Sequence, residues 1–164
     1  MDWSQVAVVG VMADSHDHLP AIRRAVDLFN SREVDLVVHA GDIVSPFTAR
    51  EFRHLKAPLL GVFGNNDGDR VHLHQFFSGI GEFHPDPLLV TLGGKDVALT
   101  HTPEIVRSLA HTCDVVLYGH THEQDLAHQP ALIVNPGECC GYLTGRQTVA
   151  LLHLPDMTAD IVAL

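Results

Sequence analysis

The sequence predicts a single α/β domain that spans residues 1–164 and is built around two β-sheets. The chain has 164 residues, of which 46% are hydrophobic, and this is enough for one globular domain with a buried core. In the first half, short apolar runs alternate with amphipathic segments, which is typical of crossover units in a largely parallel sheet. The second half is richer in strand-like runs. No repeat, low-complexity tract or linker divides the chain.

The first half begins with a strand followed by a helix. Residues 6–13 form a nearly continuous apolar run, as expected of a strand that is buried on both faces. Pro20 suits the first turn of the helix that follows, in which Ile22, Val26 and Phe29 share one face. The same alternation predicts further strands at residues 35–40 and 58–63, a helix from residue 46 to about residue 55, and another that ends at about residue 77.

The second half is expected to form the other sheet. Gly93-Gly94 lies between two strand-like runs and indicates a hairpin. A short helix is expected to start near Pro103, and a second hairpin is expected around Pro155-Asp156. The expected strands of this half are residues 88–92, 96–100, 115–118, 131–134, 147–153 and 158–162.

Composition narrows the classes of function. The net charge of −10 argues against a nucleic-acid or anionic-membrane partner, because both require a basic surface. No apolar run approaches membrane-spanning length, and the N-terminus has no basic leader of a signal peptide. Cys113, Cys139 and Cys140 form no Cys-x-x-Cys pair, so neither a disulfide framework nor a structural zinc site is expected. These features together favour a cytoplasmic protein.

Side chains with metal-binding chemistry follow the ends of five predicted strands. One such Asp or His is usually a turn or cap residue, but turns do not select histidine, so the repetition favours a common site. The ends of strands that run together meet at one edge of a sheet, where ligands bind in open α/β folds. The residues concerned are Asp14, His16, Asp42, Asn65, His101, His120 and His122.

These seven groups suit two divalent ions that share one ligand. Asp42 is the expected bridge, because it stands alone on the shortest loop and Gly41 lets the backbone approach closely. The mixed nitrogen and oxygen set suits Mn²⁺, Fe²⁺, Ni²⁺ or Zn²⁺. Two ions ~3.5–4 Å apart can hold a hydroxide and clamp a phosphoryl group for in-line attack.

The order of these motifs resembles the calcineurin-like metallophosphoesterase superfamily. That family carries Asp-x-His, Gly-Asp, Gly-Asn-His-Asp, a lone His and Gly-His-x-His, and the chain matches them in order from Asp14 to His122. The short length and the sequence Asn135-Pro136-Gly137 resemble its small phosphodiesterase branch, which includes bacterial and archaeal enzymes and a retromer subunit. The resemblance implies an α/β four-layer α/β/β/α sandwich of two mixed sheets flanked by helices.

The resemblance also implies roles for the seven residues and a small phosphoester substrate, with diesters favoured over monoesters. Mn is the expected metal, and Ni, Fe and Zn are alternatives. A metal-bridging hydroxide would attack phosphorus and expel an alkoxide or aryloxide. One ion would take Asp14, His16, Asp42 and His122, and the other would take Asp42, Asn65, His101 and His120.

The third motif departs from the family pattern, because Asn66 stands where His is usual. We expect Asn66 to contact substrate through its amide, which can donate a hydrogen bond but cannot act as an acid. The loss of acid catalysis typically costs about 10²–10⁴-fold. The sequence therefore predicts slow turnover and a preference for good leaving groups such as nitrophenolates.

Several alternatives stay open at this point. Asp67 either orients a metal ligand from behind or caps the helix that follows it. Asn135-Pro136-Gly137 either closes the floor of the site or forms a plain turn. The chain as a whole could be an inactive scaffold on the same fold, or a hydrolase of another ester that uses one metal. The oligomeric state is also open, a homo-oligomer included.

Overall fold

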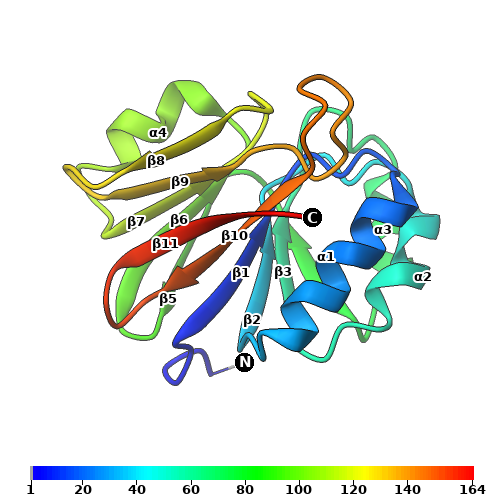
Figure 1. Cartoon of the computed structure of the whole chain (residues 1–164), viewed down its shortest axis with the longest axis horizontal. Helices are drawn as coiled ribbons and strands as arrows, with labels where there is room; N and C mark the ends of the chain where they lie inside the picture. Colours follow the sequence, from blue (N-terminus) through cyan, green and yellow to red (C-terminus); the bar gives the residue numbers. More distant parts are fainter. Residues whose placement is uncertain (1) are drawn as a thin grey trace.

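Two β-sheets pack face to face, and helices cover the outer face of each, in the computed structural model, which describes residues 2–164 (Figure 1). This arrangement confirms the prediction of a four-layer sandwich of two mixed sheets. The apolar core has three parts, one between the sheets and one between each sheet and its helices.

The first sheet, here called sheet A, has six strands in the order β11-β10-β1-β2-β3-β4. Strands β1 to β4 run parallel, whereas β10 and β11 are antiparallel additions at one edge. The strands are β1 Val8–Met12, β2 Leu36–His39, β3 Leu59–Val62, β4 Gly81–His84, β10 Thr148–His153 and β11 Thr158–Ala163. The helices of this half are α1 Leu19–Ser31, the 3₁₀ turn η1 Pro46–Thr48, α2 Ala49–Phe52 and α3 Arg70–Phe76.

The second sheet, sheet B, has five strands in the order β5-β6-β7-β9-β8. Its central strands β6, β7 and β9 are parallel, and β5 and β8 pair antiparallel at the edges. The elements are β5 Leu88–Leu92, β6 Lys95–Thr100, β7 Val115–Tyr118, β8 Gln124–Ala127, β9 Leu132–Pro136 and the helix α4 Pro103–Leu109.

The central strand β1 shows why its sequence is apolar throughout. Val9 and Val11 point into the core between the sheets, whereas Met12 packs among the helices on the other face. Phe29 of α1 lies directly over Gly10, where an added Cβ would be 2.6 Å from the ring. A strand buried on both faces has no solvent-facing positions for polar residues, so alternation disappears.

Three elements differ from the sequence prediction. The helix expected to reach about residue 55 is a 3₁₀ turn followed by a short α2 that ends at Phe52. Strands β4 and β8 were not predicted. Both are edge strands: β4 buries only Phe83, and no residue of β8 is fully buried. An edge strand with so few buried side chains lacks the apolar pattern by which strands are found in a sequence.

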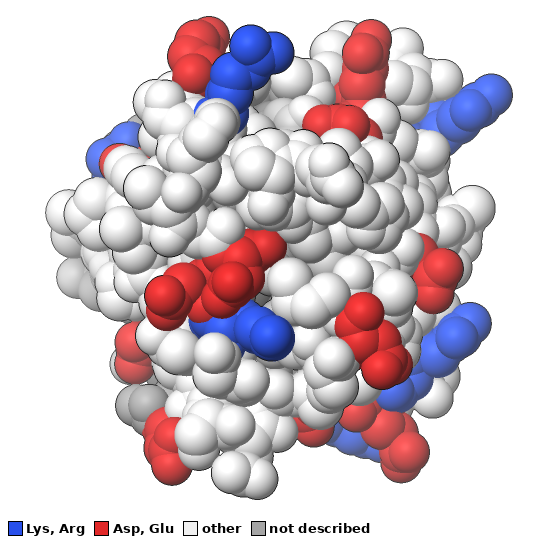
Figure 2. Space-filling view, turned by 90° about the vertical axis from the view of Figure 1, so that its left-hand side faces the viewer, with Lys and Arg blue, Asp and Glu red and all other residues white. Residues whose placement is uncertain are grey.

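No helix within residues 2–164 is long and apolar enough to cross a membrane. The three cysteines are free thiols in the described chain, and the cytoplasmic location stays a prediction. Figure 2 shows the side of the molecule that carries α4 and sheet B, where Lys and Arg side chains are scattered and Asp and Glu lie between them. The expectation of no nucleic-acid partner, which rests on the net charge of −10, stays a prediction.

Candidate metal centre

The seven predicted ligands lie just after the C-terminal ends of parallel strands in both sheets. Residues 14 and 16 follow β1, residue 42 follows β2, and residue 65 follows β3. From sheet B, residue 101 follows β6 and residues 120 and 122 follow β7. The two sheets face each other, so their loops meet at one edge of the sandwich.

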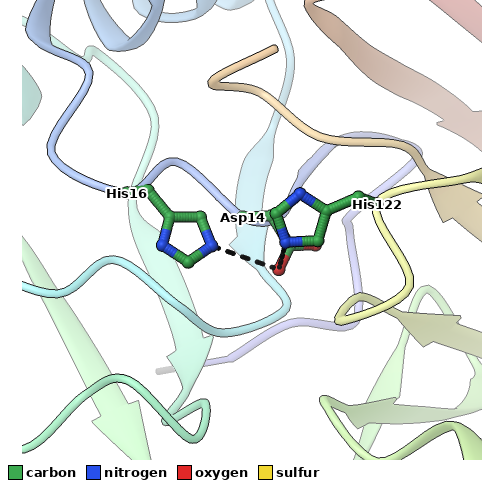
Figure 3. Close-up of side chains that lie close together, drawn as sticks. All are labelled: Asp14, His16 and His122. Atoms are coloured by element: carbon green, nitrogen blue, oxygen red, sulfur yellow. Dashed lines mark ion pairs between the residues drawn. The ribbon is translucent and has the colours of Figure 1, made fainter. Parts of the chain in front are cut away.

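On the β1 side, Asp14 lies between two histidines (Figure 3). Its Oδ1 is 3.9 Å from His16 Nε2 and 3.5 Å from His122 Nε2, and the two histidine rings stack with centroids 5.1 Å apart. Asp14 Oδ1 and His16 Nε2 are both buried and have no hydrogen-bond partner among residues 2–164. Buried polar atoms are costly without partners, so this side has the character of a cation site.

Asp42 lies between histidines that come from the two sheets. Its Oδ2 is 3.5 Å from His16 Nε2 and 3.3 Å from His101 Nε2. The same carboxylate accepts hydrogen bonds from the backbone and side-chain nitrogens of Asn66, at 2.8 and 2.7 Å. One oxygen facing an imidazole on each side is the arrangement expected of a bridging carboxylate.

The β6 side is organised around Asn65. Its Oδ1 is 3.1 Å from His101 Nε2 and 2.9 Å from His120 Nδ1. His101 Nδ1 donates to the carbonyl of Ala40 at 2.7 Å. Such a bond to the distal ring nitrogen holds an imidazole in a fixed orientation and leaves Nε2 directed at the site.

The donor set fits divalent metal ions. Two groups, Asp14 with His16 and His122, and Asp14 with Asp42 and His101, each bring one ligand atom per residue within 4.8 Å of one another. Carboxylate, imidazole and amide donors suit the transition metals expected from the sequence. The number of ions and the role of each of the seven residues as a ligand stay predictions that this geometry supports.

The backbone is unusual at the same positions. Residues with side chains rarely adopt a positive φ, and each instance costs of order 1–3 kcal/mol. Such strain is typical of functional sites. Positive φ values occur at five of the seven predicted ligands, namely Asp14, His16, Asp42, His120 and His122, where they range from 39° to 77°.

Glycines beside the site allow its parts to approach closely. A Cβ added at Gly41 would lie 2.5 Å from His101 Nδ1, and one added at Gly64 would overlap the carboxylate of Asp42. Gly41 also has a φ of 95°, which a side chain would strain. The close approach expected at Gly41 is therefore present.

Asp67 holds the backbone beneath Asp42. Its Oδ2 accepts from the backbone nitrogens of Asp42 at 3.0 Å and Gly64 at 2.6 Å, and its Oδ1 accepts from Val44 at 2.7 Å. The residue that caps α3 is Asp69, so the helix-cap alternative for Asp67 is wrong. The contacts of Asp67 fit a residue that orients a ligand from behind.

The two carboxylates of the site titrate in opposite directions. Burial raises the pKa of Asp14 to about 6, despite the nearby His101 and His122. Burial also acts to raise the pKa of Asp42, but hydrogen bonds from His101 and Asn66 outweigh it and leave that pKa well below its ordinary value. A bound cation would favour the ionised form of both groups.

Two further residues, neither of them predicted as a metal ligand, contact the predicted ligands or their loops. Buried Asn135 donates to Thr121 Oγ1 at 3.0 Å, and so braces the loop between the two β7 histidines. Glu138 is fully buried and accepts from His122 Nδ1 at 2.7 Å. Asn135 Oδ1 also accepts from Gly137 N at 2.9 Å, so this residue forms a turn and contacts the loop of the site as well. The signal for Glu138 was its place just after a predicted strand, as for the other site residues.

A cavity of about 250 Å³ opens beside the β6 side of the site. Asn65, His101 and His120 line it, together with Arg70. The guanidinium of Arg70 lies 5.0 Å from the ring centre of Phe63. Room for an organic group therefore adjoins the predicted ligands, and its wall carries the carboxylates of Asp86 and Glu104 as well as the guanidinium of Arg70.

These features match a known class of protein, and the chain belongs to the calcineurin-like phosphoesterase superfamily. The sequence signature of that superfamily domain matches residues 8–157. Membership confirms the resemblance inferred from the motifs and the prediction of a phosphoric ester hydrolase.

Individual relatives agree with this assignment. A phosphodiesterase of Methanocaldococcus jannaschii is 42% identical over 151 residues, which cover 88% of this chain and 91% of that protein. A probable metallophosphoesterase of Methanothermobacter thermautotrophicus is 31% identical over 143 residues, 79% of this chain and 76% of that protein. The solved structure of an archaeal phosphodiesterase superimposes with a TM-score of 0.90 at 37% identity, covering 96% of this chain and 99% of that one.

A more distant structure shares the fold. Vacuolar protein sorting 29 of Cryptosporidium parvum superimposes with a TM-score of 0.67 at 18% identity, covering 97% of each chain. At this identity the likeness shows the fold alone.

Proposed function

We propose that this chain is a metal-dependent phosphodiesterase that binds two divalent ions between its sheets. The observation that carries the proposal is the pair of buried atoms Asp14 Oδ1 and His16 Nε2, which have no hydrogen-bond partner in the described chain and face each other at 3.9 Å. The relative from M. jannaschii, named a phosphodiesterase, supports the diester preference. Residues 1–164 act as one domain in this proposal.

The ligands divide between two ions with Asp42 shared. Mn²⁺ is the expected metal, because mixed imidazole, carboxylate and amide donors suit it and no thiolate is needed. Bound ions would activate water and neutralise charge on the phosphoryl group. One set is Asp14, His16, Asp42 and His122, and the other is Asp42, Asn65, His101 and His120.

Asn66 is the expected contact with substrate. Its amide nitrogen donates to Asp42 Oδ2, so it stands directly beside the shared carboxylate and can turn its donor toward a phosphoryl oxygen. It cannot give a proton to a departing oxygen at neutral pH. The enzyme should therefore favour esters whose leaving group is stable without protonation.

The test is hydrolysis of bis-p-nitrophenyl phosphate with Mn²⁺, together with metal analysis of the purified protein. Wild-type protein should bind two ions and hydrolyse the diester, and Asp42→Asn should reduce the rate by more than about 100-fold. Loss of a ligand should cost more than the ~10–100-fold typical of losing a residue that only supports one. The exposed His111→Ala is a matched control and should retain activity.

The same measurements separate the alternatives. A rate equal to that of Asp42→Asn across several metals would favour an inactive scaffold, an idea suggested by Asn66 in place of the usual histidine. A stoichiometry of one ion per chain would favour a single-metal hydrolase. The unpartnered atoms at Asp14 and His16 argue against a scaffold that binds no metal.

A further inference from the structure

The segment after β9, residues 137–147, forms a loop that rises beside the site, and we call it the 137–147 loop (orange in Figure 1). Its backbone is tied to the end of β1: Cys139 N donates to Ala13 O at 3.0 Å, and Cys140 N donates to Asp14 O at 3.1 Å. The loop is therefore fixed directly behind one of the predicted ligands.

Glu138 is the second residue of this loop, and none of its surface is exposed. Its Oε1 accepts from Thr144 Oγ1 at 2.7 Å, from Leu143 N at 3.0 Å and from Thr144 N. Its Oε2 accepts from His122 Nδ1 at 2.7 Å and from Cys140 Sγ at 3.2 Å. A buried charge requires such a set of donors, and here they come from both the loop and a predicted metal ligand.

The carboxylate also determines which nitrogen of His122 carries the proton. An ionised carboxylate only accepts hydrogen bonds, so the neutral His122 ring must carry its hydrogen on Nδ1. The other nitrogen, Nε2, then presents its lone pair, and it lies 3.5 Å from Asp14 Oδ1. Only this tautomer can bind a metal at that position.

We infer that Glu138 is a positioning residue, which fixes the Nδ1–H tautomer of His122 for metal binding and anchors the 137–147 loop beside the site. The inference rests on the proposed function, because it assigns His122 as a ligand. Glu138 thus links the 137–147 loop to His122, which lies 16 positions earlier in the sequence. The loop carries the exposed side chains of Tyr142 and Leu143, and the same carboxylate that orders this loop also orders the ligand.

Glu138→Gln tests the inference with an isosteric change. The amide oxygen should take the place of Oε1, because Leu143 and Thr144 offer backbone N–H groups that can only donate. The amide nitrogen then faces His122 Nδ1, which must become an acceptor. The histidine should switch to the Nε2–H tautomer and lose its lone pair toward the site.

The tautomer is measured on metal-free protein by long-range ¹H–¹⁵N correlation spectra at pH 8. The wild type should show His122 as Nδ1–H, and Glu138→Gln should show Nε2–H. Calorimetric titration with Mn²⁺ should then show affinity ~10–100-fold weaker in the variant. An Nε2–H tautomer in the wild type overturns the inference without any variant, and so does equal Mn²⁺ affinity in wild type and Glu138→Gln.

Thr144→Val is the matched control. It removes the hydroxyl bond to Oε1 but keeps the backbone bond and the contact with His122. We expect the wild-type tautomer and nearly unchanged Mn²⁺ affinity in this variant. An affinity loss equal to that of Glu138→Gln would mean that loop packing, and not the tautomer, is responsible, and would overturn the inference. A wild type that binds no Mn²⁺ would instead contradict the proposed function.

Discussion

The two sides of the candidate centre differ in how their polar atoms are satisfied. On the β1 side, Asp14 Oδ1 and His16 Nε2 face each other without a hydrogen bond, and buried Glu138 supports His122 from behind. On the β6 side, Asn65 Oδ1 already lies within hydrogen-bonding distance of both neighbouring histidines, His101 and His120. The β1 side is thus arranged to receive a cation, whereas on the β6 side His120 Nδ1 can donate to Asn65 Oδ1 without one.

This difference implies an order of metal binding. An ion on the β6 side must first displace the hydrogen bond from His120 to Asn65, and one such bond corresponds to about 1 kcal/mol. We therefore expect the β1 side to bind its ion about fivefold more tightly. The more open side, which adjoins the cavity lined by Arg70, is where substrate and solvent should meet the centre.

The largest effects should come from removing one histidine on each side. His122→Ala and His120→Ala should each lower diester hydrolysis by more than about 100-fold, because loss of a ligand exceeds the ~10–100-fold cost of losing its support. Their titrations with Mn²⁺ should differ: His120→Ala should keep the tighter of two binding events, and His122→Ala should lose it. If His120→Ala loses the tighter event instead, the proposed asymmetry is reversed.

The site was predictable from the sequence where a motif directly follows a strand. Asp14 and His16 come at the end of an apolar run, and His120 and His122 come at the end of another. Parallel pairing places each pair at the C-terminal edge of its own sheet, and the packing of the two sheets brings the pairs together. The strands were predictable from their apolar runs, apart from the edge strands β4 and β8, which bury too little to leave a pattern.

The supporting residues needed the three-dimensional structure. Asp67 binds the backbone of Asp42, which lies 25 positions earlier, and no spacing rule distinguishes that role from a helix cap. Glu138 lies 16 positions after His122, and a turn-like sequence does not distinguish a buried acid from an exposed one. The strained backbone at the ligands is likewise invisible in a sequence, because those residue types adopt other conformations elsewhere.

Replacing Asn66 by the histidine usual in the family tests how the rate depends on the leaving group. Asn66→His places an acid beside the shared carboxylate, where it could protonate a leaving oxygen. We expect hydrolysis of phenyl and alkyl esters to rise by up to about 100-fold, the lower end of the effect of general acid catalysis. The nitrophenyl diester should change little, because nitrophenolate leaves without a proton. An equal gain for all esters would mean that the histidine acts by another route.

A smaller effect is expected from Asp67, the residue that holds the backbone of the loop carrying Asp42. Asp67→Asn leaves one oxygen for three backbone donors, of which Asp42 and Gly64 share Oδ2. Hydrogen bonds to a charged group contribute about 1.5–3 kcal/mol, so the metal-free protein should lose about 2 kcal/mol in its free energy of unfolding. Urea unfolding followed by circular dichroism measures this. An unchanged midpoint would show that the carboxylate charge is not needed to hold the Asp42 loop.

The smallest effect concerns His39, a buried histidine at the end of β2. Its Nε2 lies 2.9 Å from the hydroxyl of Ser15, the residue between the predicted ligands Asp14 and His16. Burial lowers the pKa of His39 to about 3; His101 and His16 also lower it, and Asp42 acts to raise it. Below the ordinary value of about 6.5 the unfolded chain binds a proton that the folded chain does not, so stability falls as the pH falls toward 3.

His39→Gln removes the titrating imidazole, and the glutamine amide can keep the contact with Ser15. Between pH 6.5 and 5.5, the metal-free wild type should lose about 1 kcal/mol more than the variant, because the other titrating groups are common to both. Urea unfolding at the two pH values measures the difference. If the two proteins lose stability in parallel, His39 is protonated in the folded state over this range. The β1 side would then be more open to solvent than its burial indicates, and its contrast with the β6 side would be correspondingly weaker.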